Sequence, residues 1–367
     1  MPIAIHGKFE GGDGQIFTPP PTGADHKLIQ RWTKAKMWFN MLDAQYHESI
    51  THLGFTHLLM DGVSVCVHRN LSERHPVFKL LAPHFRHMHA INNLAANTLI
   101  DFGGYVDLDM YYGRKHMLRL IAKHNTKWHL NQQGSLKWDL ENRGVEGLPG
   151  YYFKDDAWNI HEAIRNYVEE YLKLYYENDN TVKQDEELQA LRRELTAPRS
   201  LTGGGGCGMQ GVPNFDSISS LATSLVSFIY ICSVEHSATN FPQYEQYGFP
   251  PNYAAKLNGH PEEQHGATQL DAALPTGKEF FSTIRMMKLL TTVLTNNLGN
   301  YEKEYMNAMD KDAQRIVQNF QKALGQITID IKNRNSQIQQ HPQNQWKVQT
   351  YPYTWLLPDR VLNSISI

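Results

Sequence analysis

A proline-free segment between Pro21 and Pro76 is the feature that most constrains the fold. Alanine, leucine and methionine are common in it, so we predict one or two long helices over residues 28–70. The segment carries HESITHLGFTH at 47–57, in which His52 and His57 are five residues apart. On a regular α-helix that spacing puts two side chains about 140° apart, too far round to share a metal ion. A single π-type turn would bring them onto one face, and such turns often mark functional sites.

A second histidine motif lies in HSATN at 236–240. His236 and Asn240 are four residues apart, so an ordinary helix places them on one face. Three imidazoles and one amide oxygen form a mixed nitrogen and oxygen donor set. Such a set suits a redox-active first-row metal, non-haem iron above all, better than a thiolate-type zinc site. The chain has 18 histidines, so two of them often fall near each other and the histidine pattern alone does not establish a metal site. HESITH is also one residue too long for the HExxH zinc-protease helix, which excludes that motif.

Composition narrows the class of protein. The 367 residues allow one large domain or two ordinary ones, and the net charge of −2 provides no general basic field for nucleic acid. Three widely spaced cysteines, Cys66, Cys207 and Cys232, indicate free thiols in a reducing compartment. The N-terminus has no apolar core long enough for a signal peptide. We therefore expect a cytoplasmic protein that does not bind nucleic acid.

The order of the predicted elements indicates a mainly α fold. We expect one domain over residues 1–367, with an extended N-terminal arm at 1–27 and a glycine-rich loop at 198–215. Helical periodicity predicts helices over 157–177, 185–195, 279–299 and 302–334. The most apolar run, 217–234, contains six serines and a threonine. We interpret it as part of a buried central helix over 216–240 rather than as a membrane span.

Several longer motifs resemble one family. THLGFTHLLMDGVSVCVHRNLSERHPVFKLLAPHFRHMHAINNLA at 51–95 is similar to the first ligand helix of lipoxygenases and the helical segment after it. HSATNFPQY at 236–244 resembles their second ligand helix, and YPYTWLLPDRVLNSISI at 351–367 resembles their C-terminus. PIAI at 2–5, WTKAK at 32–36 and WNIHEAIRNYVEEYLKLYY at 158–176 also match the family pattern. The resemblance runs from residue 2 to residue 367.

The resemblance implies a lipoxygenase-like helical catalytic domain, built around a long central helix pair that carries a non-haem iron. The implied iron ligands, which are also the implied catalytic residues, are His52, His57, His236, Asn240 and the terminal carboxylate of Ile367. A buried carboxylate requires a cation partner, which agrees with that role for the chain end. The ligand types also fit manganese.

The implied activity is insertion of O₂ into polyunsaturated fatty acids, giving conjugated hydroperoxides for oxylipin biosynthesis. Two alternatives stay open at this point. One is a lipoxygenase-like isomerase of fatty-acid hydroperoxides, and the other is an inactive lipid-binding homologue. The implied partners are a polyunsaturated fatty acid and O₂, with peripheral contact to a membrane surface as a further option and no transmembrane segment.

Other residues take roles from the resemblance position by position. Glu48 and Gln243 match positions that hydrogen-bond around the asparagine ligand. The implied substrate-binding residues are Ile91, Ala95, Leu99, Val106 and Leu294.

The sequence departs from the family in two ways. We expect a minimal form without the N-terminal β-sandwich and with a more open cleft that also admits esterified lipid. Tyr253, with Lys256 nearby, stands where plant relatives place an arginine that holds the fatty-acid carboxylate.

Overall fold

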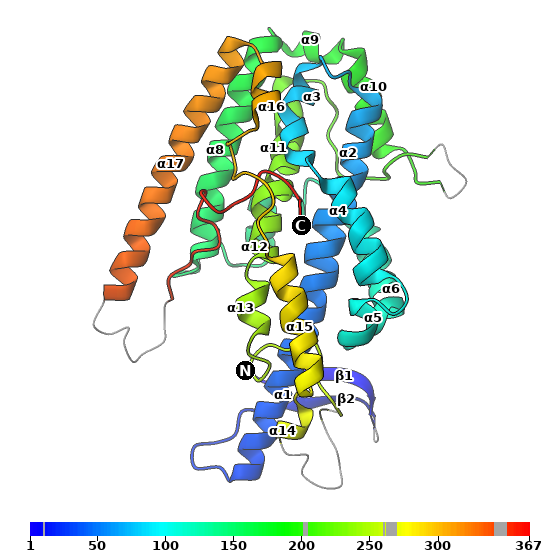
Figure 1. The fold of residues 1–367 in the computed structure, drawn as a ribbon, viewed down its shortest axis with the longest axis vertical. Helices are drawn as coiled ribbons and strands as arrows, with labels where there is room; N and C mark the ends of the chain where they lie inside the picture. Colours follow the sequence, from blue (N-terminus) through cyan, green and yellow to red (C-terminus); the bar gives the residue numbers. More distant parts are fainter. Residues whose placement is uncertain (10–11, 201–204, 260, 262–269, 341–350) are drawn as a thin grey trace. The chain divides into compact units, whose positions relative to one another are not determined.

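The computed structural model describes residues 1–9, 12–200, 205–259, 261, 270–340 and 351–367. Within these ranges the protein is mainly helical, which confirms the predicted fold class (Figure 1). The chain divides into two compact units, each built from three separate stretches. The first unit comprises Met1–His52, Leu94–Ala122 and Thr239–Thr292. The second comprises Leu53–Asn93, Lys123–Ala238 and Val293–Ile367.

The first unit begins with a β-hairpin where the sequence predicted only an extended arm. Strands β1 (Ile3–Phe9) and β2 (Gly12–Phe17) pair antiparallel, with Ile3 opposite Phe17. Helix α1 (His26–Tyr46) comes next, and the Asp25 side chain caps its N-terminus by accepting a hydrogen bond from the Leu28 N–H at 2.8 Å. The pairing of these two strands was not predicted, and helix α1 begins at His26, inside the segment 1–27 that was predicted as an arm.

A small apolar core holds this unit together. Trp38 and Met41 of α1 are buried with Ile5 of β1 and Phe17 of β2. The other helices of the unit are η3 (Ala96–Ile100, a π-helix), α5 (Tyr105–Asp109), α6 (Gly113–Asn125, which runs on into the second unit), α13 (Gln243–Tyr247), α14 (Leu270–Ala273) and α15 (Gly277–Leu290).

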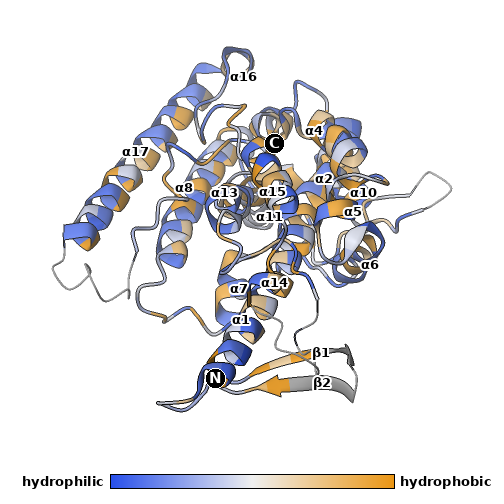
Figure 2. Ribbon diagram, turned by 60° about the horizontal axis from the view of Figure 1, so that its bottom comes forward, coloured by the Kyte–Doolittle hydropathy of each residue, from blue (hydrophilic) through white to orange (hydrophobic). Residues whose placement is uncertain are grey.

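The second unit is built around helix α8 (Tyr152–Tyr175), which packs against α11 (Ile218–Tyr230) and α17 (Lys311–Gln340). Figure 2 shows hydrophilic and hydrophobic residues interleaved along α17. Its buried hydrophobic residues recur every three or four positions, at Ala313, Ile316, Val317, Phe320 and Leu324. That spacing places them on one face, which is why this helix can bury a stripe against α8.

The remaining helices of the second unit surround this core. Helix α2 packs against α10, and the 3₁₀ turn η2 packs against η4. These helices are α2 (Leu59–Asn70), α3 (Pro76–Leu81), η2 (Ala82–Phe85), α4 (Met88–Ala95, which ends in the first unit), α7 (Leu136–Asn142), α9 (Asp179–Lys183), α10 (Glu186–Thr196), η4 (Ile231–Glu235, a π-helix), α12 (His236–Asn240, which also ends in the first unit) and α16 (Lys303–Ala308).

Within the described residues, two helical segments are long and apolar enough to cross a membrane, His26–Asn70 and Ile218–Tyr247. About two-thirds of the most apolar window in each is buried inside the structure, 61% and 72% respectively. Core helices of soluble proteins pass the same test, so this is weak evidence for a membrane span. The predicted central helix at 216–240 corresponds to the second segment.

Residues 198–200 and 205–215 of the predicted glycine-rich loop are described, and residues 201–204 lie outside the described part of the chain. Backbone N–H groups of Cys207, Gly208 and Met209 donate to carbonyl oxygens at the end of α10, each at 2.9 Å. This part of the loop is therefore fixed to α10 by main-chain hydrogen bonds.

Candidate metal centre

The helix that carries His52 and His57 is a π-helix, η1 (His47–Leu58), between α1 and α2. A π-helix is hydrogen-bonded between residues five apart, so side chains at that spacing lie near one another on one face. The π-type turn that the spacing of His52 and His57 requires is therefore present, and it extends over twelve residues.

Three imidazoles come together at this point. In the second unit, the His57 and His236 rings meet edge to face with centroids 5.0 Å apart. Helix η1 itself fixes His52 relative to His57. One ring nitrogen from each of the three histidines lies within 4.8 Å of the other two. All three side chains are buried, with at most 6% exposed.

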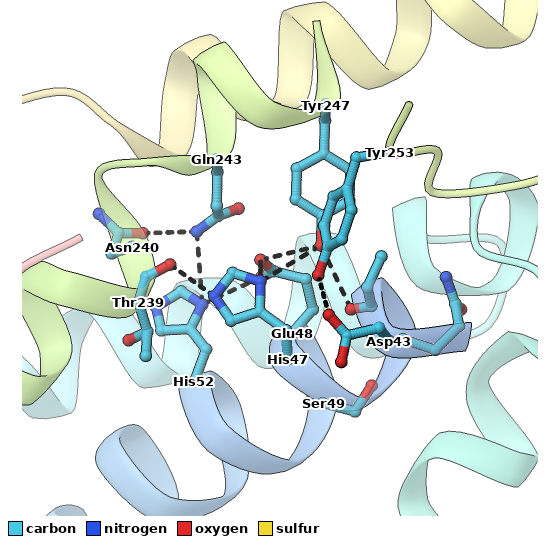
Figure 3. Close-up of polar contacts among 12 residues, drawn as sticks. Asp43, His47, Glu48, Ser49, His52, Thr239, Asn240, Gln243, Tyr247 and Tyr253 are labelled. Carbon is cyan, nitrogen blue, oxygen red and sulfur yellow. Dashed lines mark hydrogen bonds and ion pairs between the residues drawn. The ribbon is translucent and has the colours of Figure 1, made fainter. Parts of the chain in front are cut away.

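The environment of His52 favours a neutral, metal-binding imidazole (Figure 3). Its Nδ1 donates a hydrogen bond to Glu48 Oε2 at 3.1 Å, one turn earlier on the same helix. Burial lowers the pKa of His52 to about 4, and burial raises the pKa of Glu48 to about 7. A hydrogen bond at Nδ1 is the usual way of orienting an imidazole that binds a metal ion through Nε2.

His57 is oriented in the same way by a residue that the sequence analysis missed. Its Nδ1 donates to Asn92 Oδ1 at 2.8 Å, and Asn92 Nδ2 donates in turn to Asp61 Oδ1 at 2.9 Å. Asp61 also accepts from His89 Nδ1 at 2.8 Å. This chain of contacts orients the His57 ring, with Nε2 as its candidate metal-binding nitrogen.

Both ends of the Asn240 side-chain amide have partners. Its Oδ1 accepts from Gln243 Nε2 at 2.9 Å, and its Nδ2 donates to the Leu290 carbonyl oxygen at 2.8 Å. Gln243 Nε2 also lies 3.4 Å from His52 Nδ1 (Figure 3). An amide oxygen has two lone pairs, so Oδ1 retains one acceptor position for a metal ion.

Residues around Glu48 complete a polar cluster in the first unit. Tyr247 donates from its hydroxyl to Glu48 Oε1 at 3.3 Å, and His47 Nδ1 lies 3.2 Å from the same oxygen. His47 Nε2 donates to the Thr239 carbonyl oxygen at 2.9 Å. These contacts connect η1 with the segment that carries Asn240 and Gln243, as Figure 3 shows.

The C-terminal segment is buried in the second unit. Residues 361–367 are all buried, and Ile367 is 8% exposed. The Leu362 N–H donates to Ser237 Oγ at 3.2 Å, beside His236 in the sequence. His84 Nδ1 donates to the Asn363 carbonyl oxygen at 2.8 Å, and Ser366 pairs with Thr295 through their hydroxyls at 2.9 Å. The chain end is thus held next to helix α12.

The predicted substrate-binding residues fall in both units. Ala95, Leu99 and Val106 belong to the first unit, where Val106 is buried and the other two are half-buried. Ile91 and Leu294 belong to the second, where Ile91 is half-buried and Leu294 is 52% exposed. Because the five residues are divided between two units, their assignment to one substrate pocket stays a prediction.

The two polar residues near the expected carboxylate site are already paired. The Tyr253 hydroxyl donates to Asp43 Oδ2 at 2.9 Å. Lys256 Nζ pairs with Glu279 Oε1 at 2.9 Å and donates to the Leu108 carbonyl oxygen at 3.3 Å. The positive charge of Lys256 is therefore balanced within the protein.

The residues present fit a non-haem metal ion. Three buried imidazoles, each pair close enough to share one ion, offer neutral nitrogen donors. Asn240 adds an amide oxygen, and the described cluster contains no thiolate. Mixed nitrogen and oxygen donors of this kind suit iron or manganese.

Comparisons with known proteins agree with this chemistry. The family model described as Lipoxygenase matches residues 6–358. The chain is 32% identical to "Allene oxide synthase-lipoxygenase protein" of Plexaura homomalla and 30% identical to "Polyunsaturated fatty acid lipoxygenase ALOX15B" of Homo sapiens. It is 31% identical to "Hydroperoxide isomerase ALOXE3" of Rattus norvegicus. All three alignments cover 100% of this chain but 34%, 52% and 49% of the relatives, so the chain spans a third to a half of their length.

A solved structure shows the same fold. The structure described as a calcium-dependent 11R-lipoxygenase superimposes with a TM-score of 0.83 at 33% sequence identity. The match covers 96% of this chain and 50% of that one. Because the family model, the relatives and the fold agree, the chain belongs to the lipoxygenase family.

Proposed function

We propose that this protein is a non-haem iron dioxygenase that inserts O₂ into polyunsaturated fatty acids to give conjugated hydroperoxides. The observation that carries the proposal is the group of three buried histidines on η1 and α12, in a chain that belongs to the lipoxygenase family. His52, His57 and His236 would hold the metal ion, together with Asn240 and the terminal carboxylate of Ile367. Iron bound there would supply the one-electron oxidation of the substrate.

The protein's own residues would orient and isolate this centre. Glu48 accepts a hydrogen bond from Nδ1 of His52, and Asn92 accepts one from Nδ1 of His57. Each contact would direct the opposite ring nitrogen, Nε2, to the metal. Gln243 holds the Asn240 amide through its oxygen. The burial of all three imidazoles excludes bulk water, which protects a radical intermediate of the substrate from side reactions.

The substrate is proposed to enter without a carboxylate clamp at Tyr253 and Lys256, because Asp43 and Glu279 already engage these two side chains. Neutral, esterified lipid then becomes a substrate class to compare with free fatty acid. We also propose a cytoplasmic location, with transient contact at a membrane surface for access to esterified lipid.

The test uses untagged protein purified in air. Oxygen uptake and conjugated-diene absorbance are followed together on linoleic and arachidonic acids and on a phospholipid that contains them, with iron and manganese measured on the same sample. The proposal predicts that O₂ is lost and diene gained in equal amounts, in proportion to bound iron. A variant with His57 replaced by alanine should lose both signals together with the metal.

Other outcomes point to the alternative functions. Bound metal without O₂ uptake would contradict the dioxygenase and favour a hydroperoxide isomerase, which needs no O₂ and is the name of one relative. That possibility is tested by loss of a supplied fatty-acid hydroperoxide. Absence of both metal and turnover would favour an inactive lipid-binding homologue.

A further inference from the structure

Two of the three cysteines are neighbours in the second unit, although they lie far apart in the sequence. Cys66 is buried on α2, and Cys207 is half-buried in the loop that comes after α10. Their thiols interact with each other. The third cysteine, Cys232, is completely buried in η4.

Helix α2 makes room for the second sulfur through a glycine. A Cβ added to Gly62 would lie only 2.9 Å from Cys207 Sγ. Gly62 and Cys66 are four residues apart, so they share the face of α2 on which Cys207 rests. The absence of a side chain at Gly62 is therefore what allows the Cys207 thiol to reach Cys66.

The loop that carries Cys207 is fixed to α10, and α10 is in turn joined to α2. The Cys207 N–H donates to the Glu194 carbonyl oxygen of α10 at 2.9 Å. The Glu194 side chain pairs with Arg69 of α2 at 2.9 Å and accepts a hydrogen bond from Asn70. The two thiols are thus held together by contacts that do not depend on either sulfur.

The two thiols differ in reactivity. Interaction with the Cys66 thiol lowers the pKa of the Cys207 thiol, with the nearby Arg199 guanidinium contributing in the same direction. The same pairing and burial raise the pKa of Cys66. Because a thiolate is the nucleophile in thiol oxidation, Cys207 is the thiol that an oxidant meets first.

We propose that Cys66 and Cys207 form a redox-active dithiol, in which a hydroperoxide oxidises Cys207 and Cys66 then closes a disulfide between α2 and the loop after α10. Nothing in the comparisons assigns this role. In its choice of oxidant the inference rests on the proposed function, because hydroperoxides are the compounds that the dioxygenase would make and an isomerase would consume.

The chemistry balances in two steps. The Cys207 thiolate attacks the peroxide, so an S–O bond forms, the O–O bond breaks and the alkoxide takes up a proton to leave as an alcohol. Cys66 sulfur then attacks the sulfenic acid of Cys207, so an S–S bond forms and the hydroxide leaves as water with the Cys66 proton. In sum, two thiols lose two electrons and two protons, and one hydroperoxide becomes an alcohol and a water molecule.

The experiment uses the full chain with its metal, reduced and then freed of reductant. Hydrogen peroxide and linoleic acid hydroperoxide are added separately at equal concentration, free thiols are alkylated, and peptides are mapped without reduction by mass spectrometry. We expect a linked pair of peptides that joins Cys66 to Cys207 and lacks two hydrogen atoms, while Cys232 is alkylated only after denaturation. Dithiothreitol should reverse the link.

Substitutions separate the two roles. In Cys66→Ala, Cys207 should stop at a sulfenic acid that dimedone traps, and in Cys207→Ser, Cys66 should stay a thiol. Cys232→Ala is the matched control and should form the disulfide as the parent does. Gly62→Ala displaces the Cys207 sulfur, so the disulfide should form several-fold more slowly. Accumulation of higher Cys207 oxides in the parent protein with Cys66 still alkylatable would overturn the proposal.

Failure of this inference is distinguishable from failure of the proposed function. The hydrogen peroxide arm requires no turnover of lipid. A protein that forms the disulfide with hydrogen peroxide but consumes no O₂ with fatty acids would support the dithiol and contradict the dioxygenase. A protein that oxygenates fatty acids but never links Cys66 to Cys207 would do the reverse.

Discussion

At the scale of single residues, the candidate metal centre depends on side chains that do not touch the metal. Asn92 fixes the ring of His57, and Glu48 fixes the ring of His52. Each acts through Nδ1, so it sets the orientation of the ring and makes Nε2 the candidate metal-binding nitrogen.

Replacing Asn92 by alanine should weaken metal binding about 10- to 100-fold, because the His57 ring loses the partner that sets its orientation and proton position. Competition with a chelator, together with the metal content of the protein, measures the change. Asn142→Ala, an exposed position on α7, is the matched control and should bind metal as the parent does. Equal affinity in both variants would contradict a role for Asn92.

How far the sequence predicts these residues depends on how local their contacts are. His52 and His57 are on one helix, as are His236 and Asn240, so the spacing indicates what each pair needs to share a face: a π-type turn for the first pair and an ordinary helix for the second. Asn92 is 35 positions away from its partner His57, and an asparagine in a helix carries no pattern that marks it. The resemblance supplied Gln243 but not Asn92.

At the scale of secondary-structure elements, the spacing of two histidines predicted a π-type turn, and the structure has a π-helix there. Two further π-helices, η3 and η4, were not predicted, because the motifs around them contain no pair of residues that requires one. The hairpin β1–β2 was also missed. Its strands are defined by backbone pairing with each other, which a search for helical periodicity does not detect.

The packing of α17 on α8 provides a test at this scale. Phe320 is 3% exposed and stacks on Tyr167 with ring centroids 4.6 Å apart. Phe320→Ala should lower the free energy of unfolding by about 3–5 kcal/mol, since it removes a buried ring and leaves a cavity. Ile329 on the same helix is 52% exposed, so Ile329→Ala should lower the free energy of unfolding by about 0.5 kcal/mol or less. Chemical denaturation of both variants measures their free energies of unfolding, and equal losses of this free energy would contradict this packing.

At the scale of the whole molecule, the buried C-terminal segment depends on His84. Its Nδ1 donates to the Asn363 carbonyl oxygen, and its Nε2 lies 3.2 Å from the Tyr301 hydroxyl. Burial lowers the pKa of His84 to about 4, whereas an unfolded chain has it near its ordinary value of about 6.5. Between these two values the unfolded state binds more protons than the folded state, so acid favours unfolding.

Stability should therefore fall as the pH is lowered from about 6.5 to about 4, with a contribution from His84 of up to about 3 kcal/mol. Denaturant unfolding across this pH range measures it. His84→Gln removes the titrating group and should show a shallower dependence of the unfolding free energy on pH. An unchanged slope in that variant would show that His84 is not neutral in the folded protein.

Addition of one glycine after Ile367 should sharply lower bound metal and activity, because it moves the terminal carboxylate away from its proposed position. The same glycine added before Met1 serves as control and should leave the metal content unchanged. Metal analysis and O₂ uptake, measured on both proteins, test this prediction. Full metal content and activity in the C-terminally extended protein would exclude the carboxylate as a ligand.

The alternation of the two units along the chain has a consequence for how the protein is made. The first unit takes its residues from positions 1 to 292 and the second from 53 to 367, in six interleaved stretches. No single cut releases either unit, and neither can finish folding while the chain is only half synthesised. Contacts between residues far apart in sequence form slowly and leave apolar surface exposed meanwhile. We therefore expect slow refolding through populated intermediates, and a recombinant yield that depends strongly on temperature and chaperones.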